Sequence, residues 1–594
     1  MEPVSAFSVH AGQRGNAEQL PSRKKKKDNS QKAYSRRRKQ KDVKQSANQQ
    51  RRRKERTKAA RKSNDTSNAV KLDKPNSTSS AVLRKLKLKL KAKKERKMKE
   101  WKKKKKSGKG EAIQMTEVQS VNVKTKNSES DSNNMDTNDS VNANELNVDY
   151  VSAHDPVENS RQLLGWLLHP IDIKIFFKDN WEKTPVYVKR DQPNYYRHIV
   201  STPLLDEVLR KNHILFTKHI DITSYSGGVR ETHNPPGRAL PSVVWDYYQN
   251  QCSVRMLNPQ TFIPAIHALN STLQESFGCF VGANLYLTPP NSQGFAPHYD
   301  DVEAFILQIE GQKRWRLYKP LSANEYLPRY SSKNFDQSEI GEPILDTVVK
   351  AGDLLYLPRG TIHQGTTLDD THSLHVTLSV YQRNSWFDLL EKVLPQALKR
   401  AADNDRRFRQ GLPLDYLTYV GAAYDASDRK DAFKSDINNL IALLLEHVDV
   451  DNAADLMAKN HIHDFLPPFV FKNERKCTVA EDGEIMTTNG LVKNRAEIMP
   501  ETRMRLLRLH CIRLIQEDTY RVYYSTENSK EYHEYEPQFV DVDEEFVPAI
   551  KQLIASYPDF ISVKELPIKD DDRKIQIVKD LWEKGLILTE NPLC

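Results

Sequence analysis

His298 and Asp300 lie two positions apart and are the first residues whose types and spacing suit metal chemistry. The flanking segments 284–287 and 304–309 are rich in β-forming residues, which predicts strands, and residues two apart on a strand project from one face. An imidazole beside a carboxylate supplies two ligands of the 2-His-1-carboxylate triad, which holds non-haem Fe(II) and leaves positions open for oxygen chemistry. Because such pairs also occur by chance, the prediction needs a third ligand.

The segment from Gly352 to His363 offers that third ligand. Gly352 predicts a turn before an apolar strand, and Pro358 and Gly360 predict a second tight turn that directs His363 back toward the interior. The sequence therefore predicts a metal site made of His363 and the first pair of residues.

Two further histidines, His372 and His375, are alternative ligands because they follow closely. They lie beside or within the alternating segment 373–380, which predicts a strand that passes close to the metal. A fourth protein ligand would block a position that oxygen and a cosubstrate need. We therefore expect His375 to be a core or supporting histidine with satisfied hydrogen bonds.

Lys313 is the predicted anchor for a carboxylate of 2-oxoglutarate. On a strand, Lys313 shares one face with Trp315 and Leu317, whereas Arg314 and Arg316 lie on the other face. Because its neighbours on that face are apolar, we expect Lys313 to point inward. We expect it after a turn that follows the His298–Asp300 strand. A buried ammonium is costly without a partner, and a bound dicarboxylate would supply one. The alternative is that Lys313 lies on the surface.

Four segments together resemble the JmjC-type ribosomal oxygenases: 284–290, 296–308, 352–364 and 372–384. The resemblance covers roughly residues 155 to 594 and implies a double-stranded β-helix, the small cupin jelly roll. It also implies that His298, Asp300 and His363 are the catalytic iron ligands and that Lys313 binds the distal carboxylate of 2-oxoglutarate. The further positions that the resemblance places around the cosubstrate are Asn284, Tyr286 and Thr377.

The resemblance implies a dioxygenase that uses Fe(II), 2-oxoglutarate and O2 on protein substrates. The family carries two activities, hydroxylation of a histidine in a large-subunit ribosomal protein and demethylation of methylated lysines of histone H3. These imply roles in ribosome biogenesis and in chromatin and transcription regulation. The aspartate ligand Asp300 favours the hydroxylase, but the sequence leaves both substrates open. Two rivals are a catalytically silent cupin that acts as an RNA-binding assembly factor or corepressor, and a zinc or manganese cupin.

The charge of the chain is unevenly distributed. Residues 1–110 hold 39 of the 91 lysines and arginines but only 9 of the 79 aspartates and glutamates, whereas the rest holds 52 and 70. The tail has too few large apolar residues to form a core, so we expect residues 1–150 to be a disordered basic tail followed by a polar linker. Its basic clusters predict import into the nucleus and nucleolus and contact with RNA or DNA phosphates; the alternative is a solubilising arm.

The predicted fold is mixed α/β with three folded parts, which the resemblance assigns as a JmjC catalytic domain at 151–384, a helical dimerisation region at 385–500 and a winged-helix-like module at 501–594. The helical segment 431–446 carries more apolar residues than one stripe needs, which predicts a partner helix, either in a second subunit or in the same chain. Acidic runs in the last part oppose phosphate contact and favour a protein-interaction module.

The five cysteines show no Cys-x-x-Cys spacing, so we expect reduced thiols and no structural zinc site. No apolar run approaches the roughly 18 residues of a membrane span, and the polar N-terminus does not resemble a secretory signal. The expectation is a soluble intracellular protein, forming a dimer or higher homo-oligomer.

Overall fold

The computed structural model describes residues 119–122, 155–531 and 535–594. The basic clusters and most of the polar linker lie outside the described residues. One strand inside the expected linker is described: β1 (Gln119–Asn122) pairs in parallel with β2 (Val186–Lys189).

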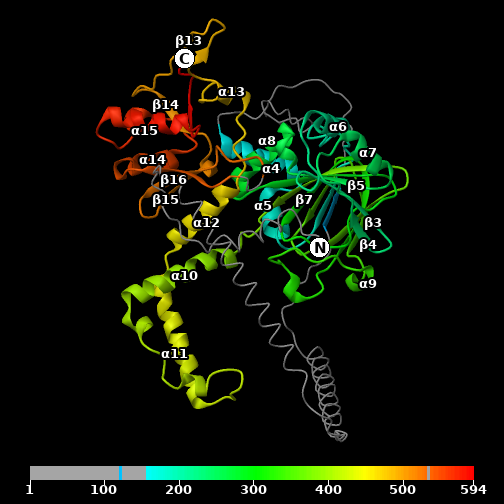
Figure 1. Ribbon diagram of the computed structural model, residues 1–594, viewed down its shortest axis with the longest axis horizontal. Coiled ribbons are helices and arrows are strands. Elements are labelled where there is room, and N and C mark those ends of the chain that lie inside the picture. Colours follow the sequence, from blue (N-terminus) through cyan, green and yellow to red (C-terminus); the bar gives the residue numbers. More distant parts are fainter. Residues whose placement is uncertain (1–118, 123–154, 532–534) are drawn as a thin grey trace, which may run out of the picture. The chain divides into compact units, whose positions relative to one another are not determined.

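One long strand, β7 (Glu303–Tyr318), organises the main sheet. Its first half pairs with β9 (Leu354–Leu357) and β11 (Ser373–Val380), and its second half pairs with β8 (Leu345–Lys350) and β10 (Ile362–Thr367). β7 therefore takes part in both sheets of the double-stranded β-helix (Figure 1). The turn that we expected before Lys313 is absent from this strand. Instead Gly311 bends the strand, with a φ of 64° that suits glycine.

The other strands extend the sheet from β11 to its far edge. The order continues β11, β6, β5, β3, β4, and all these neighbours are antiparallel. The bounds are β6 (Gly282–Thr288), β5 (Ser253–Leu257), β3 (Ile220–Ser226) and β4 (Val229–Thr232). β4 is an edge strand, joined to β3 by a two-glycine turn.

Helices cover the outside of this sheet. α8 (Pro264–Phe277) buries Ile266, Leu269, Leu273 and Phe277, as its apolar spacing predicts, and contacts α4 (Pro156–Leu168). Asp155 caps α4 by accepting the backbone N–H groups of Val157 and Glu158. Shorter elements complete this part of the chain: α5 (Ile173–Ile175), the π-helix Phe176–Asn180, α6 (Thr202–Lys211), α7 (Pro241–Gln249) and α9 (Gln337–Ile340).

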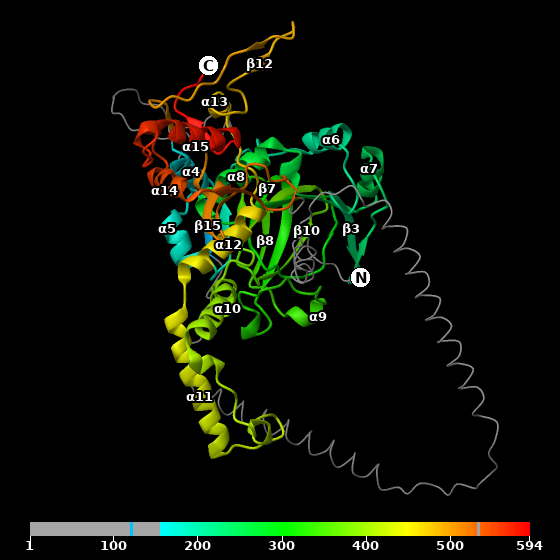
Figure 2. The same cartoon turned by 60° about the vertical axis from the view of Figure 1, so that its left-hand side comes forward.

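A helical region follows the β-helix (Figure 2). It contains α10 (Trp386–Asn404), α11 (Asp428–Leu444) and α12 (Val450–Asp464), and α10 contacts α12. Ser385 and Asp388 form a capping box at the start of α10. Among the described residues α11 has no fully buried member, and it contacts α10. Its partner helix, in a second subunit or in the same chain, stays a prediction.

The C-terminal part has its own core. Its helices, α14 (Val547–Ser556) and α15 (Asp571–Glu583), pack against strand β14 (Arg503–Leu506), which pairs with β19 (Ile587–Thr589) and β18 (Ile561–Ser562). The remaining elements are α13 (Lys472–Arg475), the hairpin of β12 (Ile485–Met486) and β13 (Val492–Lys493), and the sheet of β15 (Ile512–Gln516), β16 (Tyr520–Tyr524) and β17 (Gln538–Val542). In the described ranges, no helix is both long enough and apolar enough to cross a membrane.

Candidate active site

The backbone itself brings the three predicted ligands together. His298 and His363 exchange backbone hydrogen bonds, with N···O distances of 3.2 and 2.8 Å, in an isolated antiparallel bridge. Asp300 accepts the backbone N–H of Gly360 at 3.0 Å through its carbonyl oxygen. His363 lies in β10, after the tight turn that the sequence predicts. The prediction of a strand through His298 and Asp300 is wrong, because apart from the bridge at His298 these residues lie in the loop before β7.

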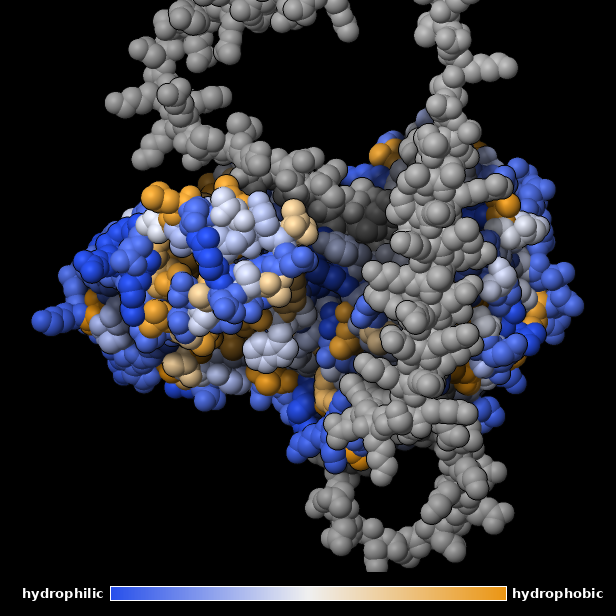
Figure 3. Space-filling view, turned by 90° about the horizontal axis from the view of Figure 1, so that it is seen from below, coloured by the Kyte–Doolittle hydropathy of each residue, from blue (hydrophilic) through white to orange (hydrophobic). Residues whose placement is uncertain are grey.

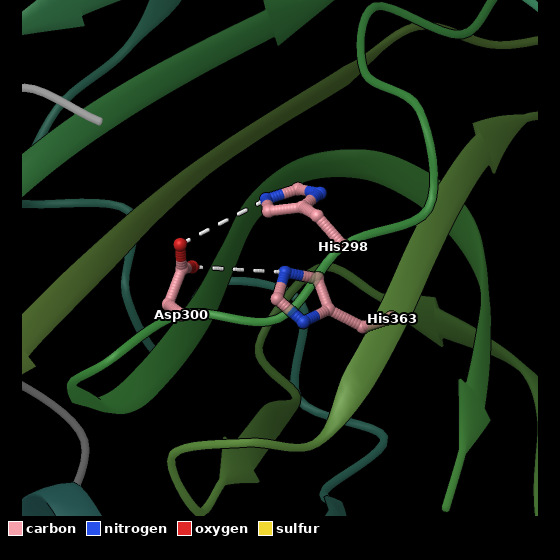
Figure 4. Close-up of side chains that lie close together, drawn as sticks. All are labelled: His298, Asp300 and His363. Carbon is pink, nitrogen blue, oxygen red and sulfur yellow. Dashed lines mark ion pairs between the residues drawn. The ribbon is translucent and has the colours of Figure 1, made fainter. Parts of the chain in front are cut away.

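The three side chains converge on one point (Figure 4). Oδ1 of Asp300 lies 3.9 Å from Nε2 of His298, and Oδ2 lies 3.8 Å from Nε2 of His363. All three ligand atoms lie within 4.8 Å of one another. Such an arrangement can surround one metal ion and leave its other side open.

Backbone carbonyls orient both imidazoles. Nδ1 of His298 donates to the carbonyl of Ala296 at 2.8 Å, and Nδ1 of His363 donates to that of Thr361 at 3.0 Å. Each Nε2 therefore keeps its lone pair for the space beside Asp300. Burial, together with the neighbouring His298, lowers the pKa of His363 to about 4, so its imidazole is neutral at pH 7 and available to a metal.

The seven residues predicted to bind the metal or the cosubstrate all line one cavity. They are His298, Asp300, His363, Lys313, Asn284, Tyr286 and Thr377. Asn284 and Tyr286 come from β6 and Thr377 from the neighbouring β11, where the register pairs Thr377 with Asn284. Lys313 comes from the second half of β7, which pairs with β8 and β10. The strands thus gather residues that are up to 93 positions apart in sequence around the metal-ligand candidates.

Lys313 faces inward, and the prediction from its parity is confirmed. Its side chain is 4 % exposed, whereas Arg314 is exposed and pairs with Asp346. Nζ of Lys313 donates to the hydroxyl of Thr288 at 3.2 Å, and no carboxylate of the described residues pairs with it. Burial lowers its pKa to about 7. Gly365 leaves room for its chain, since a Cβ at that position would lie 2.9 Å from Cε of Lys313.

His375 also lines the cavity and differs from our expectation. Its ring stacks on Tyr286, with centroids 4.8 Å apart, and meets Trp315 edge-on. It is buried, as predicted, but Nδ1 has no hydrogen-bond partner among the described residues, so the expectation of a satisfied histidine is wrong on that point.

Two arginines and a phenylalanine of the cavity were not predicted. The guanidinium carbons of Arg230 and Arg255 lie 4.5 and 5.4 Å from the ring centroid of Phe295. Arg255 also pairs with Asp221. The position of Arg255 between Val254 and Met256, inside an otherwise buried strand, was a usable signal, because a charge rarely interrupts such a strand without a partner. Nothing in the local sequence marks Arg230 or Phe295.

A double-stranded β-helix that holds two imidazoles and a carboxylate beside a buried, unpaired lysine defines a cupin-type 2-oxoglutarate-dependent oxygenase. Comparison with known families agrees: the JmjC domain matches residues 255–389, and the C-terminal winged helix domain of ribosomal oxygenase 1 matches residues 466–593. The chain belongs to the JmjC-domain ribosomal oxygenase family.

Curated relatives span most of the described chain. The "Bifunctional lysine-specific demethylase and histidyl-hydroxylase NO66" of Culex quinquefasciatus is 47% identical over 449 residues, 75% of this chain and 69% of that protein. "Ribosomal oxygenase 1" of Danio rerio is 45% identical over 458 residues, 77% of this chain and 84% of that protein. Escherichia coli YcfD, a ribosomal oxygenase solved with cobalt and 2-oxoglutarate, covers 71% of this chain and 99% of its own at 15% identity and a TM-score of 0.39.

Family membership makes the chain a 2-oxoglutarate-dependent oxygenase with Fe(II) as cofactor and 2-oxoglutarate and O2 as cosubstrates. The donor set of the site fits this chemistry. Two imidazoles and one carboxylate suit Fe(II), and the unpaired ammonium of Lys313 suits a cosubstrate carboxylate.

Proposed function

We propose that this oxygenase hydroxylates a histidine side chain of a large-subunit ribosomal protein. The relatives named histidyl-hydroxylase and ribosomal oxygenase support this substrate class. The observation that carries the choice of histidine is the pair of guanidiniums, from Arg230 and Arg255, that lie over the face of Phe295 in the cavity.

This pair disfavours a methylated lysine. Methylammonium recognition uses free aromatic faces, and here the face of Phe295 already carries two cations. A third positive charge would lie beside two guanidiniums, of which only that of Arg255 has a carboxylate partner, Asp221, and like charges in a desolvated site repel strongly. A neutral imidazole meets no such repulsion, and it can donate to or accept from the polar groups that line the cavity.

The roles of the cavity residues follow from this proposal. His298, Asp300 and His363 hold Fe(II), and Lys313 binds the distal carboxylate of 2-oxoglutarate. When bound, iron would supply the oxidising chemistry by which one atom of O2 enters a C–H bond as hydroxyl and the other enters succinate, formed from 2-oxoglutarate with loss of carbon dioxide.

The remaining residues bind and orient. Asn284 and Thr377 are opposite each other on the neighbouring strands β6 and β11. Their side chains form one wall of the cavity, beside the cosubstrate. Tyr286 stacks on His375, and burial raises the pKa of its phenol, which keeps it a neutral hydrogen-bond donor. Trp315 covers Lys313, with its ring 5.5 Å from Nζ, and excludes water from the ammonium.

A competition experiment tests the proposal. Purified protein, Fe(II) and 2-oxoglutarate are incubated with a ribosomal-protein peptide containing the histidine and a methylated histone H3 peptide in one reaction, followed by mass spectrometry. We expect the histidine peptide to gain one oxygen atom while the histone peptide keeps its methyl groups. Loss of methyl groups from the histone peptide alone would reverse the assignment and make the chain a demethylase. The Asp300→Ala variant is the control for peptide oxidation that does not depend on the metal site.

We infer that the helical region mediates homo-oligomerisation. α10 exposes an apolar row with the spacing of one helix face, and Trp386 at its start is 81% exposed. The other exposed members are Phe387, Leu390, Leu394 and Leu398 on α10 and Ile437 and Ile441 on α11, and Figure 3 shows apolar side chains among polar ones on the face seen from below. Light scattering after size exclusion should give a dimer or larger for the wild type. The double change Leu394→Glu and Leu398→Glu should give a monomer, and Lys399→Glu should not.

For the segment outside the described residues, we infer import into the nucleus and nucleolus and contact with nucleic acid. The support is its charge, 39 basic against 9 acidic residues in 1–110. A fluorescent fusion of the full chain should concentrate in nucleoli, and removal of residues 1–110 should disperse it. Equal distribution of the two fusions would contradict this inference.

A further inference from the structure

The guanidinium of Arg230 is a charged group of the cavity whose role neither the cosubstrate nor the metal explains. Arg230 lies on the edge strand β4, half-buried, and lines the cavity. In the described ranges its guanidinium forms no ion pair, and its Nε is buried without a hydrogen-bond partner. A buried donor without an acceptor costs free energy, so a natural site that keeps one indicates a missing ligand.

The charges around Arg230 leave one positive charge unbalanced. Asp221 is the carboxylate partner of Arg255, not of Arg230. Burial, with the nearby positive charge of Arg255 as the next cause, lowers the pKa of Arg230 to about 10, and even there the guanidinium is charged at pH 7. The guanidinium of Arg230 therefore attracts an oxygen atom that carries negative charge or partial negative charge.

The segment that carries Arg230 is held in place before any ligand binds. Nδ2 of Asn234 donates to Asp221 at 2.8 Å, and Oδ1 of Asn234 accepts the backbone N–H of Ile222 at 2.9 Å. The hydroxyl of Ser224 contacts Nε2 of His233 at 2.7 Å. The ring of Phe295 lies 4.5 Å below the guanidinium. Because these contacts fix both the segment around β4 and the side chain of Arg230, little conformational freedom remains to be lost on binding.

We propose that Arg230 is a substrate-binding residue that donates hydrogen bonds to an oxygen acceptor of the polypeptide substrate next to the target side chain. The acceptor is a main-chain carbonyl or a flanking carboxylate, since both offer the oxygen that a guanidinium fork binds. The inference rests on the proposed function only in requiring a polypeptide substrate. Arg230 then selects the position of the peptide, while Lys313 binds the cosubstrate.

The test compares substrate and cosubstrate kinetics in the full chain. Arg230→Ala and Arg230→Gln should raise KM for the histidine peptide by roughly 10- to 100-fold, the scale of one lost hydrogen bond to a charged group. KM for 2-oxoglutarate should rise far less than KM for the peptide. Arg230→Lys should fall between, because lysine keeps the charge but not the fork. Arg238→Ala is the matched control, since Arg238 is an exposed arginine that follows β4 and does not line the cavity.

Peptide variants separate the two acceptors. If Asp or Glu flanking the histidine lowers KM for the wild type but not for Arg230→Ala, the acceptor is a carboxylate. If Arg230→Ala loses affinity equally for acidic and amidated peptides, the acceptor is a main-chain carbonyl.

The same assay distinguishes failure of the inference about Arg230 from failure of the proposed function. An unchanged peptide KM in both Arg230→Ala and Arg230→Gln, with unaltered melting temperatures, would overturn the inference and leave the histidyl hydroxylase standing. If the wild type instead demethylates the histone peptide, the proposed function fails, and a rise in KM for that peptide in the variants would still support the binding role of Arg230.

Discussion

Lys313 Nζ lies 3.2 Å from the hydroxyl of Thr288 and has no carboxylate partner among the described residues. Lys313 is 4 % exposed, so a negatively charged group that enters the cavity would balance its ammonium. The metal-ligand candidates line the same cavity, which places the missing negative charge beside the metal. This relationship links the position of one lysine to the use of a dicarboxylate cosubstrate.

Removal of the ammonium should weaken cosubstrate binding. Lys313→Ala is expected to raise KM for 2-oxoglutarate by roughly 10-fold or more, because a charge-assisted hydrogen bond is lost. Lys313→Arg should restore part of the affinity. Succinate release at varied 2-oxoglutarate concentration measures both. A KM for 2-oxoglutarate that stays unchanged in Lys313→Ala would show that the anchor lies elsewhere.

Gly365 provides a steric test of the same site. Alanine at this position would place a Cβ 2.9 Å from Cε of Lys313 and 3.3 Å from the ring of Trp315, so the lysine must move. Gly365→Ala should raise KM for 2-oxoglutarate several-fold with little change in melting temperature, since only the end of a flexible side chain is displaced. Gly411→Ala, where a Cβ meets open space and φ is not in the left-handed region, is a control for any general effect of glycine replacement on kinetics.

Asp300 should be required for metal binding. Asp300→Ala is expected to lower the affinity for Co(II), a spectroscopic substitute for Fe(II), by more than about 10-fold, the scale seen even for residues that only support metal ligands. Titration followed by visible absorption measures it. Asp346→Ala, which removes an exposed carboxylate paired with Arg314, should bind Co(II) as the wild type does. Equal affinity in the two variants would remove Asp300 from the metal site.

Glu303 should make stability depend on pH. Burial raises its pKa to about 7, although Tyr356 and Arg359 favour the charged form. The folded state then keeps a proton that the unfolded state, with a pKa near 4.5, releases, so the free energy of unfolding falls as pH rises from 4.5 to 7. The loss is at most about 3 kcal/mol.

Glu303→Gln removes this ionisation. The difference in free energy of unfolding between wild type and variant, measured by urea denaturation, should change over that interval and level off above pH 7. A difference that is flat between pH 4.5 and 7 would show that Glu303 has an ordinary pKa in the folded state.

Local pattern predicted much of the β-helix. The parity of Lys313 and the tight turn before His363 follow from side-chain alternation and from proline and glycine, and both are present. The strand expected at His298 and Asp300 is absent. The bridge to His363 and the hydrogen bonds of the loop position these two residues instead of a strand. A short His-x-Asp spacing fits a strand or an extended loop equally well.

The residues that the sequence did not predict are those that meet only through tertiary structure. Arg230, Arg255 and Phe295 come from an edge strand, a central strand and a loop, and no spacing connects them. Their function depends on which charges remain unpaired after folding, and only the pairing of Asp221 with Arg255 reveals that. Likewise, the missing partner of Nδ1 in His375 cannot be inferred from an alternating strand.

The most direct test of the account is the mass of the histidine peptide after reaction under oxygen gas enriched in the heavy isotope. The full chain with Fe(II) and 2-oxoglutarate should add one heavy oxygen atom to the histidine and form succinate in step, and Asp300→Ala should add none. Succinate formation with no oxygen on the histidine, or equal oxygen gain with Asp300→Ala, would contradict a histidyl hydroxylase built on this site.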